Sequence, residues 1–210
     1  MIAIASKTPM IKPDLGFLGG YIKTMRQMHE GQVDKLGKPY WLHPLRVAKS
    51  MIFAIEQDQV NRDKFDSPED LPLDGITCVF GEGVFADNPV SAVTDVAKWL
   101  LLTALFHDVI EDCANGQKQL EDALAQENDE IRENVMRSVK ILTKPKSQPY
   151  LEYIFDVIDS DDAAAFYVKR ADMQSNLERV DLIEDEATRG RLRHKYRSGL
   201  AVLKYGVDKD

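Results

Sequence analysis

One long helical pattern is more apolar than any other in the chain, and it restricts the possible folds most strongly. From Ser91, a suitable N-cap residue, to about Asp112, nonpolar side chains recur at every third or fourth position. Neighbouring helices must cover such a helix, because exposure of so much nonpolar surface to water is unfavourable. The pattern therefore predicts an all-α fold with the helix of residues 91–112 at its centre.

Helical spacing also covers most of the remaining chain. Residues 17–28 and 44–58 show it, and Pro44 fits the start of the second helix because the first turn needs no backbone N–H donor. Further along, we expect Pro149 to begin one helix and Asp161 to cap another. The later predicted helices cover residues 117–126, 129–143, 149–158, 161–180 and 183–205.

We expect residues 1–210 to form a single domain, on which residues 181–210 pack as a C-terminal helix. Proline and glycine residues break any long period over residues 59–90, so we expect an irregular insertion there, between the second and third core helices. Within it, residues 76–80 and 84–85 fit a short β-hairpin. The insertion is expected either to elaborate the surface or contact another copy of the chain, or to cap the functional pocket.

Composition excludes several classes of protein. The chain has 27 Lys and Arg residues against 35 Asp and Glu, and the net charge of −8 opposes broad binding to nucleic acid or anionic membranes. No apolar stretch is long enough to span a membrane, and the N-terminus lacks a signal-peptide pattern. Cys78 and Cys113 stand alone, without the spacing of a disulfide framework or a zinc site. We therefore expect a cytoplasmic protein without nucleic-acid or membrane partners.

Four titratable side chains end the central helical pattern. At 3.6 residues per turn, His107, Asp108, Glu111 and Asp112 project over one quadrant of the helix. Three carboxylates repel one another there, and the C-terminal end of a helix dipole is already negative. A solvated acidic face accounts for Glu111 and Asp112 but not for a His-Asp pair at the end of a buried run. A bound divalent cation would relieve the repulsion.

A metal site needs more ligands than one His-Asp pair supplies. His43, just before the predicted helix start at Pro44, is one candidate, and Asp172, which interrupts an apolar helical face, is the other. The alternative for Asp172 is an ordinary exposed helix position. Imidazole and carboxylate ligands together suit manganese, iron or zinc.

The order His43, His107-Asp108, Asp172 resembles the HD superfamily of metal-dependent phosphohydrolases. The surrounding residues are similar to the hydrolase domain of RelA/SpoT-type alarmone enzymes over about residues 17–180. The motifs that carry the resemblance are His29-Glu30-Gly31-Gln32, Gly37, Pro39-Tyr40, His43-Pro44, Val47-Ala48, Ala104 to Asp112, Leu142-Thr143-Lys144, and Val168 to Asp172 with Asn176.

The resemblance implies a helical HD domain that hydrolyses the 3′-pyrophosphate of (p)ppGpp and acts as a stand-alone enzyme. It implies one Mn²⁺ ion as cofactor, a pair of carboxylates that handles the attacking water, and a supporting role for His29. It also implies that two lysines and an asparagine lie near the nucleotide. The residues in these roles are His43, His107, Asp108 and Asp172 for the metal, Glu111 and Asp112 for catalysis, and Lys35, Lys144 and Asn176 for the substrate.

Two positions depart from the family pattern. Asp34 and Glu178 stand where the family usually has arginines, so two positive charges become negative. The alternatives to (p)ppGpp are therefore another nucleotide, such as a nucleoside monophosphate or the 2′-phosphate of NADPH, and a regulatory module that binds a nucleotide without turnover. In each case the expected partner is a small nucleotide, and an oligomer is possible.

Overall fold

The computed structural model describes residues 16–62 and 90–207. Within these ranges the chain forms helices and an isolated antiparallel β-bridge between Val33 and Pro39, so the predicted all-α fold is confirmed. The predicted hairpin, like Cys78, lies outside the described residues. The elements are α1 (Leu18–Met28), α2 (Leu42–Arg62), α4 (Val90–Phe106), α5 (Val109–Asp112), α6 (Gly116–Ala123), α7 (Asp129–Leu142), α8 (Tyr150–Asp159), α9 (Ala163–Arg179), the 3-10 helix η2 (Val180–Leu182) and α10 (Glu186–Val207).

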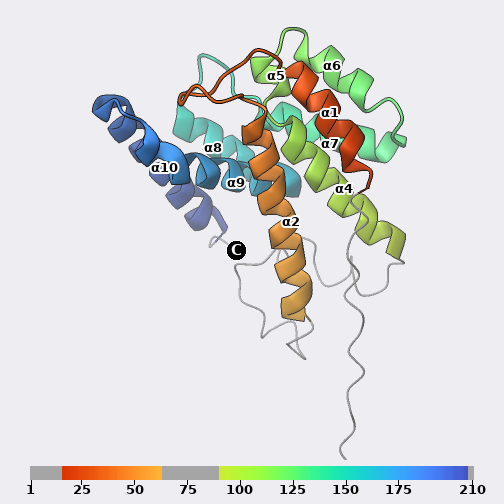
Figure 1. Cartoon of the computed structure of the whole chain (residues 1–210). Coiled ribbons are helices and arrows are strands. Elements are labelled where there is room, and N and C mark those ends of the chain that lie inside the picture. Colours follow the sequence, from red (N-terminus) through yellow and green to blue (C-terminus); the bar gives the residue numbers. More distant parts are fainter. Residues whose placement is uncertain (1–15, 63–89, 208–210) are drawn as a thin grey trace, which may run out of the picture.

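Helix α4 is the centre of the bundle, as its apolar sequence predicts. It contacts α1, α2, α7 and α9, and its side chains from Leu100 to Phe106 are all buried (Figure 1). Helix α2 in turn packs against α9. The C-terminal helix α10 packs against α8 and α9. The pairing of α2 with both α4 and α9 brings distant parts of the sequence together at one end of α2.

The sequence pattern predicted that the central helix continues to residue 112, but the structure ends it earlier. Helix α4 ends at Phe106, a turn follows at His107 and Asp108, and α5 begins at Val109. The His107 ring accounts for the break, because its Nδ1 lies 2.8 Å from the carbonyl oxygen of Ala104. In a continuous α-helix that oxygen would accept from the Asp108 N–H. The turn re-aims the polar side chains that the sequence placed on one helical quadrant.

The helix starts predicted from Pro44 and Asp161 also differ from the structure. Helix α2 begins at Leu42 and places Pro44 third, still within the turn that needs no N–H donor. The N-cap of α9 is Asp162 and not Asp161, since the Asp162 carboxylate accepts from the N–H of Ala165 at 2.8 Å. Asp161 instead adopts a positive φ of 52° in the preceding turn. A single sequence does not distinguish two adjacent aspartates as caps.

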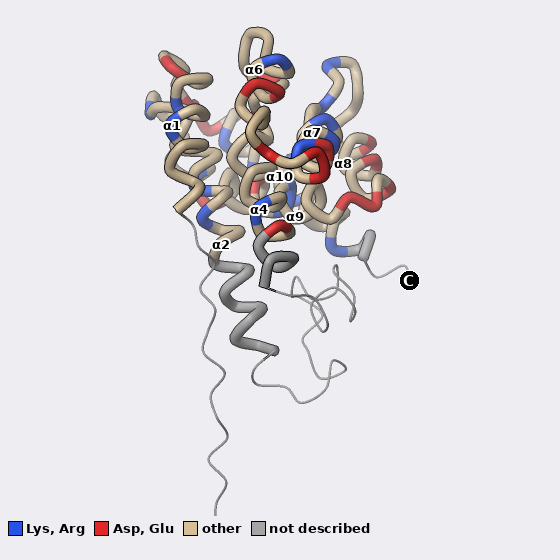
Figure 2. The backbone as a smooth tube through the Cα atoms, turned by 90° about the vertical axis from the view of Figure 1, so that its right-hand side faces the viewer, with Lys and Arg blue, Asp and Glu red and all other residues tan. Residues whose placement is uncertain are grey.

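Charged residues of both signs are interleaved over the helices (Figure 2). Acidic residues are frequent along α8, where Glu152, Asp156 and Asp159 are exposed. No helix among the described residues combines the length and the nonpolar character that crossing a membrane requires.

Gly116 allows the short helix α5 to lie against the start of α6. An ideal Cβ at residue 116 would lie only 2.0 Å from the carbonyl oxygen of Val109. We therefore expect Gly116→Ala to lower the free energy of unfolding by roughly 2–3 kcal/mol, because backbone must move to admit the methyl group. Gly190→Ala in α10 is the matched control, since nothing lies within 4 Å of that Cβ position. Urea unfolding of both variants measures the effect, and equal stabilities would contradict it.

Candidate metal centre

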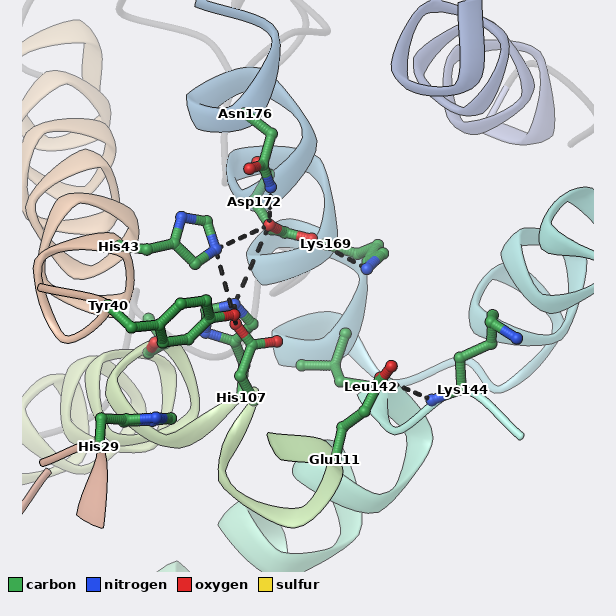
Figure 3. A network of polar contacts seen from close by, with 12 residues as sticks. His29, Tyr40, His43, His107, Glu111, Leu142, Lys144, Lys169, Asp172 and Asn176 are labelled. Atoms are coloured by element: carbon green, nitrogen blue, oxygen red, sulfur yellow. Dashed lines mark hydrogen bonds and ion pairs between the residues drawn. The ribbon is translucent and has the colours of Figure 1, made fainter. Parts of the chain in front are cut away.

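Three separate elements bring four predicted ligands together. His43 lies in the first turn of α2, His107 and Asp108 form the turn after α4, and Asp172 lies within α9. The Nε2 atom of His43 lies 3.0 Å from Asp172 Oδ1 and 3.6 Å from Asp108 Oδ2. The Nε2 atom of His107 lies 3.1 Å from Asp108 Oδ2 and 4.0 Å from Asp172 Oδ1. Figure 3 shows His43, His107 and Asp172 pointing toward a common space.

The tautomer of His107 is set by its backbone contact. Since the carbonyl oxygen of Ala104 can only accept, Nδ1 of His107 donates to it. The Nε2 atom is buried, and although Asp108 Oδ2 is close to it, no group within residues 16–62 and 90–207 has the geometry of a hydrogen bond with it. Metal-bound histidines commonly have this arrangement, in which one ring nitrogen is held by a carbonyl and the other is left for the ion.

Two neighbours on α9 orient the Asp172 carboxylate. Lys169 Nζ lies 2.9 Å from Oδ2, and the Asn176 amide donates to Oδ1 at 2.6 Å. Burial alone would raise the pKa of Asp172, but the charge of Lys169 and the contact with His43 hold it well below its usual range. The same ion pair overcomes the effect of burial on Lys169 and raises its pKa well above normal. Asp172 is therefore an anion held in a fixed orientation.

Tyr40 orients the Asp108 carboxylate in a similar way. Its hydroxyl donates to Asp108 Oδ2 at 2.6 Å from the turn before α2. Burial alone would raise the pKa of Asp108, but the charge and contact of His107 and the charge of His43 lower it below normal. Tyr40 and Lys169 belong to motifs quoted for the family resemblance, but nothing in their spacing indicated that each would hold a ligand. Their roles required the folded structure.

Glu111 and Asp112 lie one turn beyond the ligand pair, on the wall of a cavity that opens over the cluster. Both are reached by solvent, yet partial burial raises the pKa of each, and the negative charge of Asp108 adds to the effect. Glu111 Oε2 accepts from the backbone N–H of Lys144 at 3.4 Å. Two carboxylates beside a candidate cation site are suited to accept and return a proton.

The cavity has a volume of about 390 Å³ and contains charges of both signs. His43 and three tyrosines, Tyr40, Tyr150 and Tyr196, contribute ring surface to its wall. Its acidic residues are Asp34, Asp108, Glu111, Asp112 and Asp172, and its basic residues are Lys35, Arg46, Lys169, Arg179 and Lys195.

Of the three residues predicted near the substrate, two line this cavity. Lys35 and Asn176 do so, and Asn176 is also bound to Asp172. The Lys144 ammonium instead donates to the carbonyl oxygens of Pro145 and Gln148, and in Figure 3 it is turned away from Asp172. Lys144 therefore contacts the site through its backbone, where its N–H donates to Glu111.

The two departures from the family pattern have different surroundings. Glu178 is exposed and is not part of the cavity wall. Asp34 lines the cavity, but its carboxylate is occupied: Oδ1 accepts from the N–H groups of Leu36 and Lys38, each at 2.9 Å, and Oδ2 lies 3.3 Å from Arg179. These contacts hold the pKa of Asp34 below its usual value despite burial. Asp34 thus orders its own loop and pairs with a cation.

His29 lies beneath the site and does not reach the metal cluster. It is 1% exposed, its ring lies against Tyr40, and its Nδ1 is 2.8 Å from Gln32 Oε1. The Gln32 amide then donates to the backbone carbonyl of Asp112 at 2.8 Å. His29 is thus connected to the backbone of Asp112 through Gln32.

The donor set is suitable for a divalent transition metal. Among the described residues, ligand atoms of His43, His107 and Asp108 all lie within 4.8 Å of one another, and Asp172 faces both imidazoles. Two neutral nitrogens and two carboxylates satisfy manganese, iron or zinc. No family model, curated protein or solved structure matches the chain in the comparisons.

Metal binding should depend on pH in a defined direction. Burial alone would lower the pKa of His107, but Asp108 and Asp172 outweigh it and raise the pKa to about 9. At neutral pH a proton therefore occupies the metal-free site and must leave when the ion binds. We expect affinity for Mn²⁺ to rise about tenfold per pH unit between about pH 6.5 and 8.5. Calorimetry in buffers of different ionisation enthalpy measures the released proton, and a pH-independent affinity would contradict the assignment.

Proposed function

We propose that the protein is a manganese-dependent phosphohydrolase that removes the 3′-pyrophosphate of (p)ppGpp or a closely related nucleotide. The observation that carries the proposal is the convergence of His43, His107, Asp108 and Asp172 on one buried space, with Nε2 of His107 left without a hydrogen-bond partner among the described residues. Two imidazoles and two carboxylates that converge in this way are a donor set for a divalent cation. The resemblance of the surrounding motifs to an alarmone hydrolase supports the reaction and the substrate.

The reaction divides between the ion and the protein. A bound divalent cation would supply positive charge that polarises a phosphoryl oxygen and makes a water molecule more acidic. Glu111 and Asp112 accept the proton of the attacking water and return one to the departing 3′ oxygen. We treat them as a pair, because two carboxylates in one environment titrate together. Tyr40, Lys169 and Asn176 keep the ligand carboxylates in place.

The cavity wall supports a phosphorylated substrate. Lys35, Arg46, Arg179 and Lys195 place four cationic side chains around the opening above the metal cluster. Guanidinium and ammonium groups bind phosphate oxygens strongly, and arginine does so through a planar pair of donors. Tyr150 and Tyr196 also line the cavity, and the Lys195 ammonium lies over both rings, 4.3 Å and 5.5 Å from their centroids.

A nucleotide panel tests the proposal directly. Protein loaded with Mn²⁺ should convert ppGpp and water into GDP and pyrophosphate, while nucleoside monophosphates and NADPH serve as the competing substrates. Preferential turnover of another nucleotide would support the phosphohydrolase activity and contradict (p)ppGpp as its substrate. No turnover of any of them, at full metal occupancy, would contradict the proposed activity and favour a nucleotide-binding module.

A further inference from the structure

The cavity wall carries both acidic and basic side chains. The metal cluster, Glu111 and Asp112 are its acidic part, with Lys169 as the cation paired to Asp172. Arg46 and Arg179 line the same cavity, and the carboxylate of Asp34 lies 3.3 Å from Arg179. A ligand that fills this cavity therefore meets both the candidate cation site and two arginines.

Helical register places the two arginines in line with two metal ligands. Arg46 follows His43 by three residues on α2, and Arg179 follows Asp172 by seven residues on α9. These separations return each side chain to the face of its ligand, about 4.5 Å and about 10.5 Å farther along the helix axes. Helices α2 and α9 are packed together, and both arginines line the cavity that contains the metal cluster. Burial lowers the pKa of Arg46, and the neighbouring charge of Arg179 lowers it further.

Asp34 satisfies only part of this positive charge. Its Oδ2 atom lies 3.3 Å from one terminal nitrogen of Arg179, and its Oδ1 atom accepts hydrogen bonds from two backbone N–H groups. Within the described part of the chain, the Arg46 side chain has no hydrogen-bond or ion-pair partner, and its Nε atom is buried. A buried, unpaired guanidinium N–H is costly, so an acceptor from a ligand would be favourable there.

We infer that Arg46 and Arg179 form a subsite for a second phosphate group of the substrate, remote from the bond that is hydrolysed. The inference rests on the proposed function and narrows it to nucleotides phosphorylated at two separate positions. One phosphate group reaches the metal cluster, and the other is bound by the guanidinium groups that Asp34 holds in place. Arg46 is a specificity-determining residue in this arrangement and takes no part in the proton transfers.

Two substrates that differ only in the second phosphate group test the inference. Guanosine 3′,5′-bis(diphosphate) carries 5′ phosphates, and guanosine 3′-diphosphate lacks them, while the released pyrophosphate is the same. We expect Arg46→Gln to lower kcat/KM for the first substrate by roughly tenfold to a hundredfold, mainly through KM. Turnover of the second substrate should stay within about twofold of wild type.

Lys49→Gln is the matched control, because Lys49 is an exposed cation one turn along α2 from Arg46 and is not part of the cavity wall. It should leave both substrates unaffected. Equal losses on both substrates in Arg46→Gln, or no loss on either, would overturn the subsite. A loss in Lys49→Gln as large as that in Arg46→Gln would overturn it too, since net charge alone would then explain the effect.

A binding measurement separates this inference from the proposed function. Metal-free protein should bind guanosine 5′-diphosphate in calorimetry about tenfold more tightly than its Arg46→Gln variant does. If neither 3′-phosphorylated substrate is hydrolysed but this difference is found, the proposed activity is wrong and the phosphate subsite stands. If the two proteins bind guanosine 5′-diphosphate equally, the subsite is overturned whatever the activity.

Discussion

Asp172→Asn should weaken Mn²⁺ binding by more than about 100-fold and reduce hydrolysis in proportion. The substitution removes a negative charge from a buried position between His43 and Lys169. It also replaces one carboxylate oxygen with an NH2 group. Both oxygens of Asp172 face donors, Asn176 at one and Lys169 at the other, so the new NH2 group would face a donor too. Metal analysis after dialysis against Mn²⁺, together with steady-state rates, measures both effects.

Asp156→Asn is the matched control, because this substitution makes the same change of charge on the exposed face of α8. The Asp156 carboxylate accepts a hydrogen bond from Gln148 there. It should retain the ion and its activity. Circular dichroism establishes that Asp172→Asn is still folded, and His43→Gln provides a second test of the same cluster if it is not. Normal metal content in folded Asp172→Asn would show that Asp172 is not a ligand.

Glu111→Gln and Asp112→Asn should each lower kcat by roughly 10²–10⁴-fold while the protein keeps its metal. Neither carboxylate takes part in the cluster of ligand atoms, but both border the cavity at its metal end. Because the two act as a unit, the double variant should be little worse than the more damaged single variant. Rates and metal content are measured on the same samples.

Glu121→Gln is the control for this pair, since Glu121 is an exposed residue of α6 whose carboxylate accepts a hydrogen bond from Gln117. It should behave as wild type. If a variant of Glu111 or Asp112 keeps more than about a tenth of the wild-type kcat, the replaced carboxylate does not transfer a proton in the reaction. A variant that loses its metal along with its activity would place that carboxylate among the ligands.

The helices could be predicted from the sequence because they depend on local spacing. The run that became α4 is apolar on all sides, and the structure buries it at the centre of the bundle. The break at His107 could not be predicted, because the same residues also fit a continuous helix. The contact between the His107 ring and the Ala104 carbonyl favours the broken helix over the continuous one. The spacing of residues in the sequence does not indicate this contact.

The candidate metal ligands stood out in the sequence for a different reason. His107, Asp108 and Asp172 are polar residues in otherwise apolar helical faces, and such exceptions stand out in a sequence. The structure brings them together with His43. The two arginines of the cavity wall do not stand out in the same way. Arg46 and Arg179 look like ordinary helix surface until α2 and α9 are placed side by side.

The most direct test is a crystal structure of the protein soaked in Mn²⁺, with diffraction data collected at the manganese absorption edge. We expect one strong anomalous peak about 2.2 Å from Nε2 of both His43 and His107, with an oxygen of Asp108 and of Asp172 completing the protein ligands. A cluster without a peak, or a peak bound only by Glu111 and Asp112, would contradict the metal centre and with it the proposed hydrolase.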